Sequence, residues 1–350
     1  MAEAILDDYD ALISEAIRHD AEAAVQALRH KHNLLSPAEV DSLYSQKHHS
    51  KAFVEGLLSH NSVSVLIGDS GLGKSALAVQ LGLCVAAGVP FLGMKTKQGL
   101  AVNVDHENGL AGSRDLRDAL IGFLGLRKAP DDFRLWTPDY ANCPLAIEEM
   151  CREAKPTLVT VDSLRSHDPY FESTEHAGAA MRQLHSTASK HGVAIVLIHH
   201  TRKPGPDGPP TLDAEDTQLM HWLNQASGHR AIINQADTRI AADIPSRGRG
   251  GELVLRWHRR IYGEGGPIYL ERVCNEDADP IGYRRLSGPK LLGNPEQEAA
   301  FGKLPSRFAF KEAKQAYERS DDPTRKWLQK CMSLGIVEQP ERGLYIKVSQ

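Results

Sequence analysis

The 350-residue chain is 41% hydrophobic and 25% charged, which is typical of a globular protein with a sizeable core. Its formal net charge of −4 excludes a chain that is basic throughout, and no apolar run reaches the roughly 18 residues of a membrane helix, so we expect no membrane contact. The five cysteines are scattered without a CxxC pair, which argues against a disulfide framework and a cysteine zinc site and favours the cytoplasm. The acidic, amphipathic start, MAEAILDDYDALISEAIRHD, is typical of neither a signal peptide nor a transit peptide.

Short helices are expected over residues 1–51, where Ser36-Pro37 is a helix start signal. From SVSVLIG (62–68) the pattern changes to apolar strands that alternate with helical stretches. Strands are predicted at 62–67, 100–105, 157–162 and 192–199. This alternation predicts an α/β fold with a mostly parallel sheet and helices on both faces. Residues 251–273 have an antiparallel pattern with YGEGGP as the turn, and the core is expected to span 52–285.

The last part of the chain has a different pattern. Residues 286–297 have the composition of a linker, and residues 298–350 read as helix, turn, helix and short β-wing, which fits a winged-helix domain. From Ala300 onward there are ten Lys/Arg and six Asp/Glu, so this region carries +4 and the remainder of the chain −8. Such local charge permits contact with nucleic acid but does not establish it.

The segment GDSGLGKS, residues 68–75, is a complete phosphate-loop motif, G-x-x-x-x-G-K-[ST]. It lies between a predicted strand and a helix-forming stretch. Its glycines let successive N–H groups point at phosphate oxygens, and the helix N-terminus adds partial positive charge. Lys74 would hold the β- and γ-phosphates of ATP, and the Ser75 hydroxyl would bind Mg²⁺. The residues predicted to contact the nucleotide are Gly68, Asp69, Ser70, Gly71, Leu72, Gly73, Lys74, Ser75 and Ala76.

Two further strands end in carboxylates, at the sheet edge where ligands bind in open α/β folds. LVTVDSL contains Asp162, which is predicted to hold Mg²⁺ together with Ser75. LAVNVDHEN leads to Glu107, the candidate for the base that orients and deprotonates the attacking water. In AAA+ proteins this carboxylate directly follows the Walker B aspartate, but Ser163 follows Asp162 here. Asp105 is the rival candidate for the base.

Four motifs in order resemble those of RecA-fold ATPases of the RepA type (AAA_25), plasmid and phage replicative helicases and their relatives, close to the DnaB-like ring helicases. The motifs are VLIGDSGLGKSALAVQLGLCVAAGVPFLG, VNVDHEN, LVTVDSL with the loop RSHDPYFESTEH, and VLIHHTRK, within residues 52–275. The resemblance implies a RecA-like core, ATP and Mg²⁺ as cofactors, and a homo-oligomeric ring such as a hexamer with single-stranded DNA in its pore. Relatives with this core also serve as recombinases, loaders and regulators, so the resemblance is more specific for fold than for unwinding.

The resemblance also assigns the histidine pair that ends VLIHH. In this family a polar residue at that strand end senses the γ-phosphate, and matching IHH to the family makes His200 the sensor, with His199 as the alternative. Side chains alternate along a strand, so His199 is expected to pack on the opposite face and the two are not expected to share a metal ion. Arg202 and Lys203 then open a Pro- and Gly-rich segment with the features of a DNA-contacting pore loop. A solvent-exposed loop that binds nothing is the alternative.

Ring ATPases of this kind complete each site with an arginine from the neighbouring subunit, which stabilises the γ-phosphate in the transition state. The resemblance places it on the hairpin near the end of the core, where Arg259 and Arg260 stand. The spacing to Gly263 departs from the K-x-R-x-G pattern of DnaB-like relatives. We assign Arg260 to this role and keep Arg230 as the other candidate.

In the C-terminal domain, the second helix is expected to start at Asp321 or Asp322, before Pro323. Basic residues of that helix would then face a DNA backbone: Arg325, Lys326 and Lys330. The alternative is that this domain binds a protein partner.

These observations predict an ATP-hydrolysing, Mg²⁺-dependent motor that acts on DNA, best interpreted as a replicative-type helicase of a plasmid, phage or other mobile element. One alternative is a non-unwinding ATPase switch, such as a helicase loader, initiator or partition-like regulator, whose nucleotide state controls assembly. Another is a signalling or defence ATPase whose C-terminal domain recruits a protein effector.

Overall fold

The computed structural model describes residues 36–39, 42, 53–137, 144–167, 176–202, 211–214, 217–275 and 280–348. The chain divides into two compact units, Met1–Lys51 and Ala52–Gln350. In the first unit, residues 37–39 are helical, and Ser36 and Glu39 form the reciprocal contacts of a capping box: the Ser36 N–H donates to Glu39 Oε2 at 2.7 Å, and the Glu39 N–H donates to Ser36 Oγ at 3.4 Å. The remaining helices expected over residues 1–51 lie outside the described residues.

The second unit contains a nine-stranded sheet in the order β3-β2-β4-β5-β1-β6-β7-β8-β9. Six adjacent strands run parallel to one another: β1 (Val63–Gly68), β2 (Ala101–Asp105), β3 (Phe133–Trp136), β4 (Leu158–Asp162), β5 (Ala194–His200) and β6 (Thr238–Asp243). The last three are antiparallel: β7 (Leu253–Arg259), β8 (Gly263–Cys274) and β9 (Pro280–Arg285). The prediction of a mostly parallel α/β sheet is therefore confirmed.

The four predicted parallel strands are present with small shifts of their ends, whereas β3 and β6 were not predicted. Both are short and mix polar with apolar residues, so their sequences, FRLW and TRIAAD, give a weak strand signal. The antiparallel pairing within 251–273 is confirmed, but β8 already begins at Gly263, so most of the YGEGGP segment is strand rather than turn.

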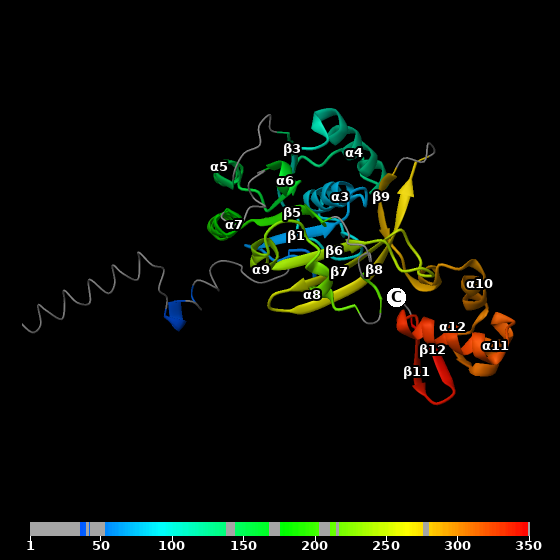
Figure 1. Ribbon diagram of the computed structural model, residues 1–350. Coiled ribbons are helices and arrows are strands. Elements are labelled where there is room, and N and C mark those ends of the chain that lie inside the picture. Colours follow the sequence, from blue (N-terminus) through cyan, green and yellow to red (C-terminus); the bar gives the residue numbers. More distant parts are fainter. Residues whose placement is uncertain are drawn as a thin grey trace, which may run out of the picture. The chain divides into compact units, whose positions relative to one another are not determined.

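Helices cover both faces of the sheet (Figure 1). On one face, α3 (Lys74–Ala87) and α4 (Gly109–Phe123) pack with Leu66 and Val196 in one apolar cluster. On the other face, a second cluster joins Val65 and Ile195 to the remaining helices of the core: α5 (Pro144–Ala154), α6 (Leu164–His167), α7 (Ala177–His191), α8 (Leu219–Leu223) and α9 (Ala231–Gln235). Among the described residues, no helix is both long and apolar enough to cross a membrane.

The C-terminal part forms a small antiparallel sheet in the order β10-β12-β11 with helices packed on it. Its elements are η1 (Gly288–Leu292), α10 (Pro295–Lys303), β10 (Arg307–Ala309), α11 (Phe310–Tyr317), α12 (Asp321–Ser333), β11 (Val337–Glu341) and β12 (Leu344–Lys347). Trp327 and Phe308 are buried at its centre. The segment 286–297, expected to be a linker, includes η1 and the start of α10, and its Leu291 and Leu292 are buried, so it is a packed connection.

The strand order brings the carboxyl ends of β1, β2, β4 and β5 together. Because these strands are parallel, their ends lie at the same edge of the sheet. Asp105 is the register partner of Asp162, and Gly68 is the register partner of His200. The polar residues predicted for the site therefore meet at one edge.

Candidate nucleotide site

The phosphate loop leaves β1 at Gly68 and enters α3 at Lys74. Gly71 and Gly73 have φ angles of 80° and 77°, a left-handed backbone that residues with a Cβ rarely adopt. A Cβ on Gly73 would lie 2.1 Å from the hydroxyl of Tyr283, so glycine is also required by packing. The loop has the conformation and the helix start that an anion-binding site needs.

Lys74 lies inside this loop with 5% of its surface exposed. Its ammonium donates to the carbonyls of Gly68 at 3.0 Å and Asp69 at 2.7 Å, and Nζ is 3.5 Å from His200 Nδ1. Burial lowers the pKa of Lys74, while the negative charges of Asp162, Asp69 and Glu107 act against that shift. The ammonium is thus placed where it can turn from carbonyls to phosphate oxygens.

Asp162 and Ser75 are joined by a hydrogen bond between their side chains. Burial, with a smaller contribution from the nearby carboxylates of Glu107 and Asp105, raises the pKa of Asp162 to about 7, against the opposing effects of the Ser75 bond and the charge of Lys74. Extra positive charge here would relieve this repulsion. A hydroxyl and a carboxylate are the hard oxygen donors that Mg²⁺ takes, together with waters and phosphate oxygens. The pair therefore fits Mg²⁺, although the described residues hold no cluster of three or more His, Cys, Asp or Glu that could bind a metal alone.

Asp105 and Glu107 have different surroundings although they are two residues apart. Asp105 is buried, and its carboxylate accepts hydrogen bonds from the N–H groups of Glu107 and Asn108, both at 2.9 Å. It also accepts bonds from the side chains of Asn108 at 2.9 Å and Ser113 at 2.6 Å. Glu107 is exposed, and its Oε1 lies 3.9 Å from His200 Nε2 and 3.3 Å from the hydroxyl of Ser166. Asp105 is engaged in shaping the loop, whereas Glu107 faces the site.

The two histidines at the end of β5 point in opposite directions. His199 is fully buried, and its Nε2 lies 2.8 Å from the carbonyl of Ser227. His200 is partly exposed and faces the phosphate loop, with Nδ1 3.4 Å from the Ser70 hydroxyl. His200 consequently lies between Lys74 and Glu107, where a terminal phosphate would meet both.

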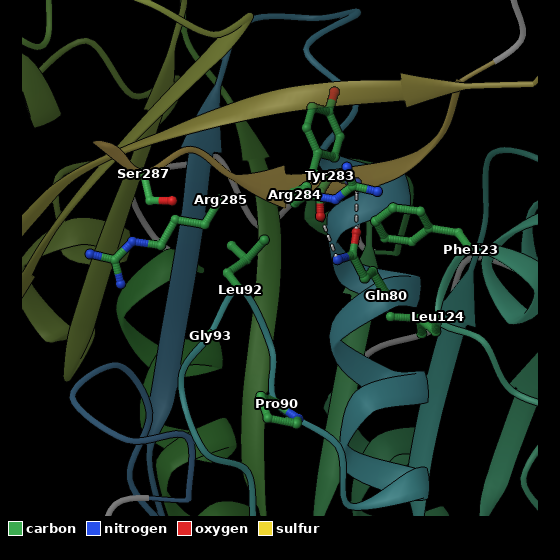
Figure 2. Close-up of a pocket in the computed structure, with 10 residues that line it drawn as sticks. All are labelled: Gln80, Pro90, Leu92, Gly93, Phe123, Leu124, Tyr283, Arg284, Arg285 and Ser287. Atoms are coloured by element: carbon green, nitrogen blue, oxygen red, sulfur yellow. Dashed lines mark hydrogen bonds between the residues drawn. The ribbon is translucent and has the colours of Figure 1, made fainter. Parts of the chain in front are cut away.

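A contact from β9 to the phosphate loop was not predicted from the sequence. The hydroxyl of Tyr283 donates to the carbonyl of Leu72 at 2.7 Å. The Gln80 side chain of α3 pairs with the backbone of Tyr283, accepting from its N–H at 2.9 Å and donating to its C=O at 2.8 Å (Figure 2). A cavity of about 760 Å³ adjoins this pair, with Phe123 and Leu92 among its lining residues. No local sequence signal marks these residues, because the contact joins segments about 200 residues apart.

The three candidate arginines differ in what they contact. Arg260 donates to the carbonyls of Asn234 at 2.9 Å and Gln235 at 2.6 Å, at the end of α9. The guanidinium of Arg259 lies 4.7 Å from the centre of the Tyr262 ring. Arg230 is exposed at the start of α9, and its side chain has no partner among the described residues.

The basic residues predicted to touch DNA are also in different situations. Arg202 donates to the carbonyl of Asn224 at 2.7 Å, and Lys203 lies outside the described residues. Arg325 and Lys326 are exposed on α12, Arg325 over the Phe310 ring and Lys326 paired with Asp322 at 2.9 Å. Lys330 was expected to face DNA, but its ammonium is largely taken up by protein acceptors, among them the carbonyl of Leu292 at 2.5 Å.

Strand β5 separates the phosphate-loop strand β1 from β4, which carries Asp162. Together with the phosphate loop, this sheet defines a RecA-like P-loop ATPase. The chain belongs to the AAA_25 family: the family model, described as an AAA domain, matches residues 29–206, just over half of the chain. A solved structure similar to this chain is the crystal structure of the RadB recombinase, at 18% identity and a TM-score of 0.45, covering 65% of this chain and 92% of that one. No curated protein matches the sequence.

Proposed function

We propose that this protein is an Mg²⁺-dependent ATPase motor that acts on DNA as a replicative-type helicase. The observation that carries the ATPase part is the meeting of four strand ends at one edge of the sheet. They bring together Lys74, the Ser75–Asp162 pair, Glu107 and His200. ATP hydrolysis needs these functions: a phosphate cradle, a metal site, a water-orienting carboxylate and a phosphate sensor.

The residues act by position and charge. The N–H groups of the phosphate loop and the ammonium of Lys74 bind the β- and γ-phosphates. Ser75 and Asp162 would hold Mg²⁺, which when bound neutralises charge on the transferring phosphoryl group. Glu107 orients the attacking water and accepts its proton, because its carboxylate is exposed toward the site while that of Asp105 is occupied by hydrogen bonds.

His200 is proposed as the sensor of the γ-phosphate. Its ring lies 3.5 Å from Lys74 Nζ and 3.9 Å from Glu107 Oε1, so a terminal phosphate bound between them would contact it. Thr201 and Arg202 follow His200 directly, and Arg202 is bonded to carbonyls at the end of α8. A shift of His200 would therefore reach the segment that continues through Lys203, which we propose as the DNA-contacting loop.

The finer parts of the proposal are DNA as the partner, a homo-oligomeric ring such as a hexamer, and unwinding. They are supported by the motif resemblance and by the order helix, strand, helix, helix and hairpin from α10 to β12, which is that of a winged helix. The arginine from the neighbouring subunit is proposed to be Arg260 or Arg230.

A strand-displacement assay with ATP and Mg²⁺ tests the proposal, run beside ATP hydrolysis with and without DNA. We expect DNA to stimulate hydrolysis and a labelled strand to be released, both of which Lys74→Ala abolishes. DNA-stimulated hydrolysis without strand release would instead support the ATPase switch. Hydrolysis that DNA does not change would leave the ATPase site in place and remove DNA from the function.

A further inference from the structure

A basic cleft with a volume of about 420 Å³ lies between the loop after β6 and helix α12. The loop contributes Arg247 and Arg249, and α12 contributes Lys326 and Lys330. The other side chains that line the cleft are the neutral hydrogen-bonding groups of Gln329 and Ser333. Neither a carboxylate nor an apolar side chain is among the described residues of this lining, so its chemistry is that of an anion site.

The loop that carries the two arginines is fixed at both ends. At its start, the Asp213 carboxylate accepts a hydrogen bond from the Ser246 N–H at 2.9 Å. At its end, the Gly250 N–H donates to the carbonyl of Leu291 at 3.0 Å. A Cβ on Gly250 would lie 2.0 Å from the carbonyl of Lys290, and one on Gly251 would lie 2.6 Å from that of Leu270. Only glycine allows this close packing, which fixes the backbone of the loop that carries the two arginines.

Lys330 joins the loop to α12. Its ammonium donates to the carbonyls of Gly248 and Leu292 and to the side chain of Gln297. The neighbouring Arg249 donates to the Ser333 hydroxyl at 3.3 Å. Burial lowers the pKa of Lys330, the positive charge of Arg249 lowers it further, and Glu298 raises it only as a weaker influence. Two like charges are thus held close together, an arrangement that a bound anion would stabilise.

Two of the cations that line the cleft remain available to a ligand. Arg247 is exposed, and its side chain has no partner within the described part of the chain. Lys326 is paired with Asp322, but both side chains are about three-quarters exposed, and such a pair contributes little and exchanges readily.

We propose that this cleft binds the sugar–phosphate backbone of DNA. Arginine, lysine, glutamine and serine side chains are the groups that contact phosphate oxygens in nucleic-acid complexes, and such contacts fix register without reading sequence. Peptide partners are bound with apolar contacts as well, which the lining does not offer. This inference rests on the proposed action on DNA. It adds that the DNA-binding surface is formed by the loop after β6 together with α12, rather than by α12 alone.

Fluorescence anisotropy with labelled oligonucleotides at several salt concentrations tests the cleft. The test variant is Arg247→Glu, because an exposed arginine without a partner can be replaced without unfolding the protein. We expect affinity to fall by roughly five- to tenfold or more, and the slope of log affinity against log salt to become shallower by about one. Arg247→Lys should restore most of the affinity. Lys128→Glu, which makes the same change of charge, is the matched control, since Lys128 is an exposed lysine far from the cleft in sequence.

Single-stranded DNA, duplex DNA and RNA of the same sequence distinguish the source of the backbone. If the wild-type protein binds DNA and Arg247→Glu changes neither the affinity nor the salt slope, the proposal for the cleft is overturned and the proposed function stays intact. Absence of DNA binding by the wild-type protein would overturn both. Tight binding of poly-L-glutamate that Arg247→Glu abolishes, with DNA affinity unaffected, would assign the cleft to an acidic peptide and also overturn the proposal.

Discussion

At the scale of single residues, the site depends on which way neighbouring side chains point. Asp105 and Glu107 are two positions apart, yet the Asp105 carboxylate accepts four hydrogen bonds from residues 107–113 and the Glu107 carboxylate lies 3.9 Å from His200. His199 and His200 are adjacent, yet one is bonded to a buried carbonyl and the other lies beside Lys74. Side chains alternate along a strand, so the adjacent His199 and His200 of β5 point to opposite faces. Strand β2 ends at Asp105, so Glu107 lies beyond the strand and does not follow its alternation.

Replacing Glu107 tests its role against that of Asp105. We expect Glu107→Gln to bind ATP with unchanged affinity and to lose turnover by about 100-fold or more, because only the water-activating group is removed. Asp105→Asn should instead lower thermal stability, since it replaces a carboxylate that accepts hydrogen bonds from two backbone N–H groups and so weakens those bonds. Nucleotide affinity, steady-state hydrolysis and thermal unfolding of both variants provide the check. Normal turnover by Glu107→Gln would show that another group is the base.

The raised pKa of Asp162 predicts a pH-dependent cost in the metal-free protein. Its ionised form is disfavoured in the folded state, where the pKa is about 7, compared with 3.8 for the ordinary group. Ionisation of Asp162 therefore lowers the free energy of unfolding. This loss is absent at pH values below 3.8 and fully present at pH values above about 7. Asp162→Asn should raise the free energy of unfolding more at pH 8 than at pH 5, by roughly 2 kcal/mol. Denaturant titrations of both proteins without Mg²⁺ measure this, and an equal effect at the two pH values would contradict it.

At the scale of elements, the phosphate loop depends on an edge strand that is distant in sequence. The Gln80 amide of α3 pairs with the backbone of Tyr283 as a neighbouring strand would, and so satisfies the free edge of β9 at that residue. The Tyr283 hydroxyl then bonds the loop carbonyl of Leu72. Tyr283 lies three residues before Leu286, where the chain leaves the sheet for the C-terminal part. The residue that contacts the phosphate loop thus lies close in sequence to the start of the C-terminal part.

Tyr283→Phe tests this contact, because it removes only the hydroxyl, which also bonds the Arg272 side chain, and leaves the carbonyl of Leu72 without its partner. We expect ATP affinity to fall by roughly five- to tenfold, as an unsatisfied buried carbonyl costs about 1–3 kcal/mol and the loop loses its shape. The turnover number at saturating ATP should change little. Binding of a fluorescent nucleotide and hydrolysis kinetics separate the two effects. Tyr262→Phe is the control, since Tyr262 is 57% exposed; equal losses in both variants would count against the role of Tyr283.

At the scale of the whole molecule, the proposed ring needs an arginine that reaches the neighbouring subunit. Arg260 is held by carbonyls of its own chain at the end of α9, whereas Arg230 is exposed without a side-chain partner among the described residues. Arg230 precedes α9 and the Arg260 guanidinium bonds carbonyls at its end, so the two candidate side chains lie at opposite ends of the same short helix. Availability therefore favours Arg230 in this conformation.

Subunit mixing decides between the two arginines. Neither Lys74→Ala nor Arg230→Ala alone should hydrolyse ATP. Mixed together, they should recover part of the activity, because the Lys74 of one subunit then meets the Arg230 of the next. Recovery with Arg260→Ala instead would assign the role to Arg260. Light scattering with and without ATP accompanies the test, and a persistent monomer would contradict the ring itself.

The sequence alone determined where the candidate nucleotide site lies, because a phosphate loop is eight contiguous residues and the ends of parallel strands meet at one edge. Lys74, Asp162 and Glu107 could thus be proposed from local patterns, and His200 from the resemblance of VLIHH to the family's motif. Only the tertiary structure showed the short strands β3 and β6, whose burial comes from their neighbours rather than from their own sequence. The tertiary structure alone also showed that Tyr283 contacts the phosphate loop and that Arg247 and Lys326 line one cleft, since these contacts join segments separated by many residues. Such long-range contacts arise only when the sheet and the C-terminal helices are packed.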